Sequence, residues 1–150
     1  MVERAGIILA AGIGKRMKSA LPKVMHPLAG RPVLGHVIAA MREAGISRIV
    51  VVRSRDADSV RDYAASLGAG SVIQDPPAGT GHAAACAREA LADFSGLLLV
   101  NNGDMPLVTG NTLAAVFSAA EETNLAIVTF RPTDAAEYGQ IGRASCRERV

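Results

Sequence analysis

Short apolar runs alternate with helical patterns along most of this 150-residue chain, and this alternation restricts the folds open to it. The runs have the length and composition of buried strands and lie at residues 6–9, 49–52, 71–73, 97–100 and 126–130. Between them, apolar residues recur at helical spacing over 33–41, 60–67, 82–91 and 112–122. Strands and helices in alternation predict an α/β fold with a mostly parallel sheet and helices on both faces.

Two glycines mark helix ends. Gly45 follows the first helical pattern and Gly68 follows the second. Glycine is favoured directly after a helix because it adopts the left-handed conformation without steric cost.

The functional residues are expected at one edge of the sheet. In open parallel sheets, ligands bind beyond the carboxyl ends of the strands. The loops after Leu9, Ile73 and Val100 are therefore the expected position of a site, and all three carry unusual residues.

Charge and composition exclude several classes of partner. The net charge of +2 comes entirely from the tail, through Arg143, Arg147, Arg149 and Glu148. Aromatic residues make up only 3% of the chain, which is too few for stacking on single-stranded nucleic acid. No apolar run approaches the roughly 20 residues of a membrane span, and no secretory signal pattern is present. We expect a cytoplasmic protein with no nucleic-acid partner and no membrane insertion.

Basic residues are concentrated near the N-terminus. No Asp or Glu lies between Glu3 and Glu43, and this asymmetry predicts a local anion site. The basic residues of this stretch are Arg4, Lys15, Arg16, Lys18, Lys23, Arg31 and Arg42.

Cysteines and histidines give no metal-site or catalytic pattern. Cys86 is expected to be a small buried residue, and it has neither CxxC spacing nor a histidine cluster. His26 and His82 lack an identifiable nucleophile or carboxylate partner, so both are interpreted as hydrogen-bonded structural histidines.

The first loop reads LAAGIGKRM over residues 9–17 and directly follows a predicted strand. Its small residues let backbone N–H groups approach a phosphate or base, and its cations can neutralise a triphosphate. The spacing fits neither GxxxxGK(S/T) nor GxGxxG. Taken alone, the loop is equally consistent with a tight turn bearing solvated lysines.

The continuation over residues 9–30, LAAGIGKRMKSALPKVMHPLAG, resembles the signature of the sugar-1-phosphate nucleotidyltransferases. The resemblance implies a Rossmann-like fold in which Arg16 and Lys23 contact phosphates as the catalytic pair. It also implies a substrate-binding loop made by Leu9, Ala10, Ala11 and Gly12. Lys15 departs from the family, in which threonine is common.

The second loop, QDPPAGTGHA at residues 74–83, resembles the members that take UTP and N-acetylglucosamine 1-phosphate. The resemblance implies that Gln74, Gly79 and Thr80 bind the uracil. The chemistry agrees, because a glutamine amide offers a donor and an acceptor to a pyrimidine edge. A proline-containing turn before a helix is the alternative for this segment.

The third loop contains Asn102, Gly103 and Asp104. An aspartate after a buried strand suits a hard cation that also takes phosphate oxygens. The resemblance implies that Asp104 is the Mg²⁺ ligand and that all three residues bind substrate. Asn102 stands where tyrosine is frequent, and the alternative role for Asp104 is a helix or turn cap.

Residues 138–141, YGQI, resemble a family segment whose glycine contacts the sugar nucleotide, here Gly139. Gln140 replaces the usual arginine. Residues 1–141 are thus expected to be the N-terminal nucleotide-binding part of a truncated nucleotidyltransferase domain. Residues 142–150 form an Arg-rich tail that does not match the family.

The implied reaction transfers UMP from UTP to N-acetylglucosamine 1-phosphate and releases pyrophosphate, for cell-envelope precursor synthesis. The resemblance also implies an oligomeric complete protein, while the present chain alone is expected to be inactive. A related cytidylyl- or guanylyltransferase, or an inactive nucleotide-binding fragment, remains the alternative.

Overall fold

The structure is a computed structural model that describes residues 2–12, 14 and 17–134. Its main elements alternate along the chain as the sequence predicts. The strands of the main sheet are β1 (Arg4–Leu9), β4 (Arg48–Arg53), β5 (Gly70–Ile73) and β6 (Leu97–Asn102). The helices are α1 (Val33–Glu43), α2 (Asp58–Ser66), α3 (Thr80–Cys86) and α4 (Gly110–Thr123), with 3-10 turns η2 (Lys23–Met25) and η3 (Glu89–Leu91). A small antiparallel hairpin joins β2 (Pro27–Leu28) to β3 (Arg31–Pro32).

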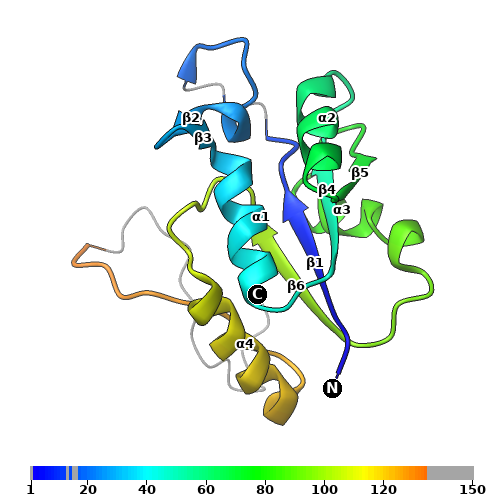
Figure 1. The fold of residues 1–150 in the computed structure, drawn as a ribbon, viewed down its shortest axis with the longest axis vertical. Helices are drawn as coiled ribbons and strands as arrows, with labels where there is room; N and C mark the ends of the chain where they lie inside the picture. The colour runs from blue at the N-terminus through cyan, green and yellow to red at the C-terminus, as the bar shows by residue number, and fades with distance from the viewer. Residues whose placement is uncertain (1, 13, 15–16, 135–150) are drawn as a thin grey trace, which may run out of the picture.

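The four strands form one parallel sheet in the order β5-β4-β1-β6. The chain moves outward from β1 through β4 to β5, and then returns to place β6 on the other side of β1 (Figure 1). All four carboxyl ends therefore lie at the same edge of the sheet. The reversal of strand order beside β1 creates the kind of crevice in which ligands bind.

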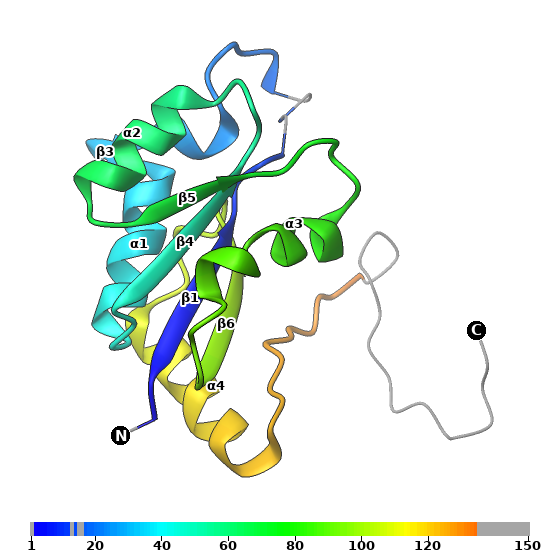
Figure 2. The ribbon, with the colours of Figure 1, turned by 90° about the vertical axis from the view of Figure 1, so that its right-hand side faces the viewer.

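Helices cover both faces of the sheet, as the sequence predicts. Helices α1, α2 and α4 lie on one face and α3 lies on the other (Figure 2). Along each strand the side chains alternate between the two layers. Ile8 and Val51 belong to the larger core with α1, whereas Ile7 and Val52 belong to the smaller core with Ala83 of α3.

The predicted glycine helix ends are confirmed. Gly45 and Gly68 have φ values of 80° and 68°, in the left-handed region. After α1, the N–H of Gly45 donates to Arg42 and that of Ile46 donates to Met41. These two bonds form a Schellman motif, which satisfies carbonyl groups that the end of a helix leaves free.

Two predicted elements differ from the structure. The helix expected over 82–91 ends at Cys86 and continues as the 3-10 turn η3, because the amides of Ala87 and Arg88 bond three residues back and tighten the chain there. Residues 126–130 form no strand, so that prediction was wrong. Ile127 and Phe130 are exposed. The main sheet has β5 and β6 at its edges, and this segment joins neither of them as a strand.

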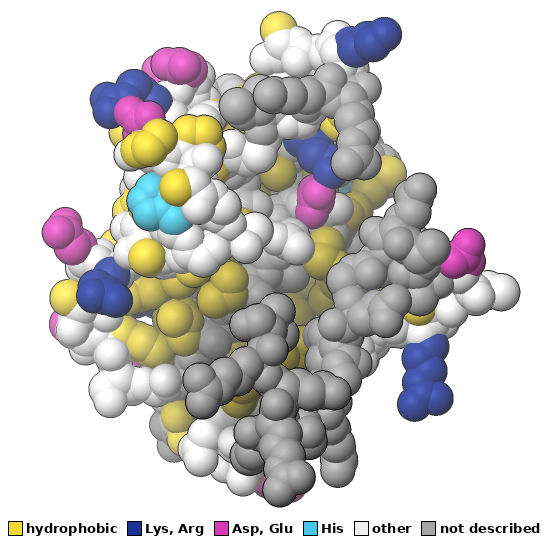
Figure 3. Space-filling view, turned by 180° about the vertical axis from the view of Figure 1, so that it is seen from behind, with side chains coloured by type: hydrophobic (Ala, Val, Ile, Leu, Met, Phe, Trp, Pro, Cys, Tyr) yellow, Lys and Arg dark blue, Asp and Glu magenta, His cyan; other side chains and the backbone are white. Residues whose placement is uncertain are grey.

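The face of β6 on the α3 side is only partly covered by described residues. Leu98 and Val100 are 46% and 48% exposed. Beside them, Ile7, Ala87 and Leu91 line an apolar groove of about 430 Å³. Hydrophobic side chains gather over this region in the view from behind (Figure 3). None of the described helices is long and apolar enough to cross a membrane.

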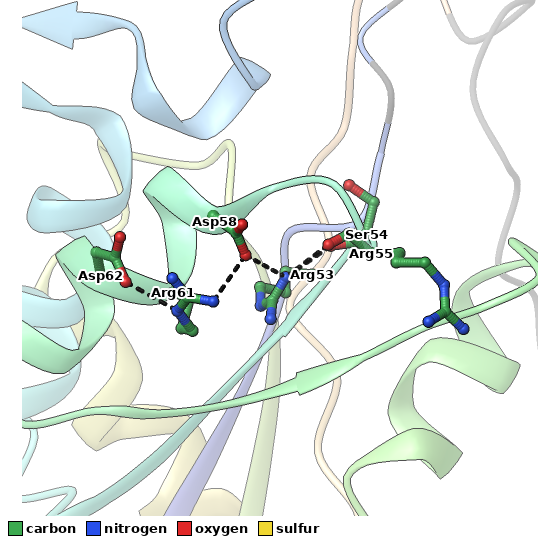
Figure 4. A network of polar contacts seen from close by, with 6 residues as sticks. All are labelled: Arg53, Ser54, Arg55, Asp58, Arg61 and Asp62. Atoms are coloured by element: carbon green, nitrogen blue, oxygen red, sulfur yellow. Dashed lines mark hydrogen bonds and ion pairs between the residues drawn. The ribbon is translucent and has the colours of Figure 1, made fainter.

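A buried arginine organises the loop between β4 and α2 (Figure 4). The Arg53 side chain donates to the backbone carbonyls of Ser54 and Arg55 and lies 3.6 Å from Asp58. The backbone carbonyl of Arg53 accepts a hydrogen bond from the backbone N–H of Gln74 at 2.8 Å. The end of β4 is thereby tied both to α2 and to the loop that follows β5.

Candidate active site

The three predicted loops meet at a cleft of about 510 Å³ at the carboxyl edge of the sheet. Ten of the residues predicted as site residues line it: Leu9, Ala10, Ala11, Gly12, Lys23, Gln74, Gly79, Thr80, Asn102 and Asp104. They come from four separate segments of the chain, which the parallel sheet brings to one edge. The cleft therefore lies where the order of the strands predicts a ligand site.

The backbone of the first loop lines one side of the cleft. The Ala10 amide donates to the Val52 carbonyl at 2.8 Å, which continues the pairing of β1 with β4. Beyond it, a Cβ added at Gly12 would meet nothing within 4 Å, so the backbone there is open to the cleft. A Cβ at Gly14, which has a φ of 57°, would lie only 3.2 Å from the Lys23 Cβ. Glycine at position 14 therefore lets Lys23 stand close to the loop.

Lys23 and Asp104 form an ion pair across the cleft. The Lys23 Nζ donates to Asp104 Oδ2 at 2.5 Å. Lys23 begins η2 directly after Pro22, and the buried Val24 anchors that turn in the core. The two side chains are 45% and 35% exposed, so both remain accessible to a ligand. An ion pair this exposed contributes little to stability.

Gly103 has a packing role and does not line the cleft. Its amide donates to the Leu9 carbonyl at 2.9 Å. A Cβ there would lie 3.0 Å from Val24 Cγ1 and 3.1 Å from the Leu9 oxygen. The missing side chain lets the end of β6 approach β1, which sets the position of Asp104 relative to the first loop. Asn102 lines the cleft and donates weakly to the Met105 sulfur at 3.9 Å.

Gln74 is almost fully buried, with 6% exposure, yet it reaches the cleft. Its amide nitrogen donates to the Gly79 carbonyl oxygen at 2.9 Å and lies 3.3 Å from His82 Nδ1. Gly79 has a φ of 90° and precedes α3, and the Ala83 amide donates to its carbonyl. The loop from Gln74 to Thr80 is thus closed by side-chain and backbone hydrogen bonds.

The donor set suits Mg²⁺ only if substrate oxygens complete it. Among the described residues, no three His, Cys, Asp or Glu side chains gather closely enough to hold a metal ion. Asp104 therefore offers a single carboxylate. Mg²⁺ commonly keeps several waters and takes one or two carboxylates together with substrate phosphates. The residues present fit such a site.

Not all of the described basic residues near the N-terminus face the cleft. Arg4 stacks on Phe117 and pairs with Glu121, and Arg42 donates to the carbonyls of Ile46 and Gly68. These arginines join elements of the fold. Of the basic residues that the structure describes in this stretch, Lys23 lines the cleft.

Three predictions fall on residues that the structure does not describe. Arg16 and Lys15 lie between the described parts of the first loop, and Gly139 lies beyond residue 134. Their roles stay predictions.

The sequence reasoning missed several lining residues. Gly14, Val24, Pro77 and Ala83 also line the cleft. All four lie inside the two motifs at residues 9–30 and 74–83, so their position in these motifs was an available signal. The contact between His82 and Gln74 depends on side-chain geometry, which no sequence pattern indicated.

Known proteins are similar to this chain in sequence. Residues 6–150 match the MobA-like NTP transferase domain. The chain is 48% identical over 139 residues to the bifunctional protein GlmU of Maricaulis maris and 47% identical over 144 residues to that of Rhodospirillum rubrum. The matches cover 92% and 94% of the chain. They cover 31% and 32% of those proteins, so the chain spans about a third of their length.

Solved structures agree with the fold. A UDP-glucose pyrophosphorylase from Acinetobacter baumannii superposes with a TM-score of 0.65 at 23% identity, covering 83% of this chain and 54% of that one. A UTP-bound form from the same organism gives 0.63 at 21% identity, covering 83% and 54%. Rv0371c of Mycobacterium tuberculosis in complex with manganese gives 0.61 at 25% identity, covering 80% and 60%. With a domain match that extends over nearly the whole chain, the protein belongs to the MobA-like NTP transferase family.

Proposed function

We propose that this chain is the nucleotide-binding part of a uridylyltransferase that joins UTP to N-acetylglucosamine 1-phosphate. The products would be UDP-N-acetylglucosamine, a precursor for peptidoglycan and the cell wall, and pyrophosphate. Support comes from the GlmU relatives at 47–48% identity. We further propose that the complete protein is cytoplasmic and oligomeric.

One observation carries the proposal. The cleft brings together a cation, a carboxylate and a side-chain amide that can hydrogen-bond to a base. These groups belong to Lys23, Asp104 and Gln74. A nucleoside triphosphate needs these three groups, because its phosphates require positive charge or metal and its base requires a specific hydrogen-bonding edge. The backbone around Gly12 leaves space for close approach.

The reaction is a displacement at phosphorus. An oxygen of the sugar phosphate attacks the α-phosphorus of UTP, and the bond to the bridging oxygen breaks as pyrophosphate leaves. No covalent bond to the protein is needed, so catalysis comes from positioning and charge neutralisation. Lys23 would hold phosphate oxygens, and Gln74 would hold the base.

A divalent cation completes the charge balance. Mg²⁺ held by Asp104 would neutralise phosphate oxygens when bound. The manganese complex of Rv0371c supports a divalent metal in a related fold. Lys23 pairs with Asp104 at 2.5 Å, so a cation on this carboxylate would compete with the lysine and leave its ammonium available to phosphate oxygens. Arg16 remains the second predicted phosphate contact.

Nucleotide profiling tests the proposal against its alternatives. The 150-residue chain is titrated with UTP, CTP, GTP and ATP in Mg²⁺ by calorimetry, and pyrophosphate release is followed with N-acetylglucosamine 1-phosphate. We expect weak binding with a preference for UTP. Tighter binding of CTP or GTP would identify a cytidylyl- or guanylyltransferase instead. Absence of binding to all four would contradict a nucleotide-binding role.

A further inference from the structure

The amide of Gln74 can be presented to a base in two ways, and the two select different bases. If the oxygen faces the base, the site accepts a hydrogen bond, which suits the N3–H of uracil. If the nitrogen faces the base, the site donates, which suits the unprotonated N3 of cytosine. Gln74 alone therefore does not determine selectivity, because the groups that fix its orientation decide it.

The hydrogen-bond partners of Gln74 fix which end is nitrogen. The atom 2.9 Å from the Gly79 carbonyl must be a donor, because a carbonyl oxygen only accepts. The same nitrogen lies 3.3 Å from His82 Nδ1. The amide nitrogen therefore faces Gly79 and His82, and the oxygen is the end left for the cleft.

The oxygen of Gln74 remains accessible. It makes no hydrogen bond to any residue that the structure describes, and the buried side-chain polar atoms without a partner among those residues belong to His26 and Arg53. Among the described residues, no donor occupies this oxygen. Since Gln74 lines the cleft, a ligand bound there can donate to it.

His82 can supply the acceptor that this arrangement needs. Its other ring nitrogen, Nε2, lies 3.8 Å from Cys86 Sγ one helical turn further along α3. A proton on Nε2 leaves Nδ1 as an acceptor for the Gln74 N–H. Both N–H groups of the amide then have a partner, as a side chain buried to this degree requires.

We propose that His82 is a positioning residue that holds the Gln74 amide with its oxygen toward the cleft, and thereby selects uracil over cytosine. The hydrogen bond to Gly79 fixes one end of the amide, but the terminal torsion of glutamine is broad. The second contact, with His82 in the first turn of α3, fixes the plane of the Gln74 amide. If the amide were reversed, its oxygen would face the Gly79 carbonyl oxygen and His82 Nδ1, which are both acceptors in this arrangement. The proposal rests on the proposed function, because it assumes that a pyrimidine occupies the cleft.

The test compares UTP with CTP in three variants at one position. His82→Phe keeps a ring but removes the acceptor. His82→Gln places an amide near the former Nε2, on the Cys86 side, whereas His82→Asn places an oxygen where Nδ1 lies. Calorimetric dissociation constants for both nucleotides are measured on the 150-residue chain and on each variant.

We expect the ratio of the two dissociation constants to move toward unity by roughly three- to tenfold in His82→Phe and His82→Gln, the usual effect of one hydrogen bond. His82→Asn should keep the wild-type ratio. Partial unfolding of a variant lowers its apparent affinity for both nucleotides by the same factor, so the ratio of the two dissociation constants still reports on the site.

Two results would overturn the inference: an unchanged ratio in His82→Phe and His82→Gln, or a loss of selectivity in His82→Asn equal to that in His82→Phe. Failure of the proposed function has a different signature. In that case the unmodified chain itself shows no preference for UTP over CTP.

Discussion

The Lys23–Asp104 ion pair joins two side chains that sequence reasoning had given separate roles. The ammonium and the carboxylate are in contact at 2.5 Å, and both are partly exposed. A triphosphate with its cation can replace this contact by two others, from lysine to phosphate and from carboxylate to metal. Nucleotide and metal are thus expected to bind as one unit.

Asp104→Asn should remove the effect of Mg²⁺ on UTP binding while the fold is kept. The substitution conserves volume but removes the anionic ligand, and a loss of about 1.5–3 kcal/mol in the metal-dependent part of binding is expected for a charged contact. Calorimetry of UTP binding with and without Mg²⁺ measures this metal-dependent part. Asp93→Asn is the matched control, because Asp93 pairs with Arg48 and does not line the cleft. An equal response to Mg²⁺ in the Asp104 variant would remove Asp104 from the metal site.

Gln74→Ala should weaken UTP binding by about 1–3 kcal/mol and reduce the preference for UTP over CTP, because the base loses its polar partner. Removal of the side chain also frees the Gly79 carbonyl and His82, so the melting temperature is measured alongside the two affinities. A UTP:CTP ratio equal to that of the unmodified chain would show that Gln74 does not read the base.

At the level of elements, α1 and α2 pack so closely that a side chain added at one glycine of α1 would meet α2. A Cβ at Gly35 of α1 would press against the Tyr63 hydroxyl oxygen of α2. We expect Gly35→Ala to destabilise the chain by about 1–3 kcal/mol, the usual cost of overpacking. Adding Tyr63→Phe should recover part of this loss, since the closest atom is then gone. Urea unfolding of both single variants and the double variant checks it, and strictly additive effects would exclude the clash.

The contact between Arg48 and Asp93 should make the stability of the fold depend on pH. The hydrogen bond from Arg48 of β4 lowers the pKa of Asp93, with smaller contributions from a backbone hydrogen bond and from the positive charge of Arg48. A pKa lowered in the folded state stabilises the fold above the ordinary carboxylate pKa, and the stabilisation is lost as pH falls through the folded value. Asp93→Asn should therefore melt slightly lower at neutral pH, and the difference should shrink as the pH falls below the ordinary carboxylate pKa and vanish once Asp93 is protonated in the fold. A difference that persists in acid would contradict it.

Patterns local in sequence predicted most of the fold. The four strands of the main sheet and the ends of α1 and α2 follow from apolar runs and glycines. The strands extend beyond the apolar runs to Arg4, Arg48 and Arg53, because backbone pairing in the sheet does not require an apolar side chain. The strand predicted at 126–130 failed because apolar, strand-favouring residues do not show whether a sheet edge is available.

The candidate site was predictable at the level of loops. The rule that ligands bind at the carboxyl ends of strands, together with the motifs, indicated three loops that the structure brings to one cleft. The ion pair of Lys23 with Asp104 and the contact of His82 with Gln74 were not predictable. Each joins side chains of different loops or elements, and such geometry is set by packing.

At the scale of the whole molecule, the described residues expose apolar surface beside β6 and after α4. Leu98 and Val100 are about half exposed, and Leu125, Ile127 and Phe130 are exposed by more than 60%. Surface of this kind favours association. We expect the sedimentation coefficient of the chain to rise with concentration, and a constant monomer value up to high concentration would contradict this.

The 150-residue chain should bind nucleotide without turning over. It spans about a third of its GlmU relatives. Holding both reactants in line is worth up to about 7–11 kcal/mol of the barrier, and a chain that positions the nucleotide alone loses that advantage. Pyrophosphate release with UTP, Mg²⁺ and N-acetylglucosamine 1-phosphate checks this. A rate near that of a complete GlmU protein would show that these residues suffice for catalysis.

Mapping where UTP binds tests whether the cleft is a nucleotide site. The ¹⁵N-labelled chain is titrated with UTP and Mg²⁺, and the chemical shift of each backbone amide is followed. We expect saturable shifts concentrated at Gly12, Gln74, Gly79 and Asp104 around the cleft. Shifts confined to the apolar groove beside Leu91, or no saturable shift at all, would contradict a nucleotide site at the carboxyl edge of the sheet.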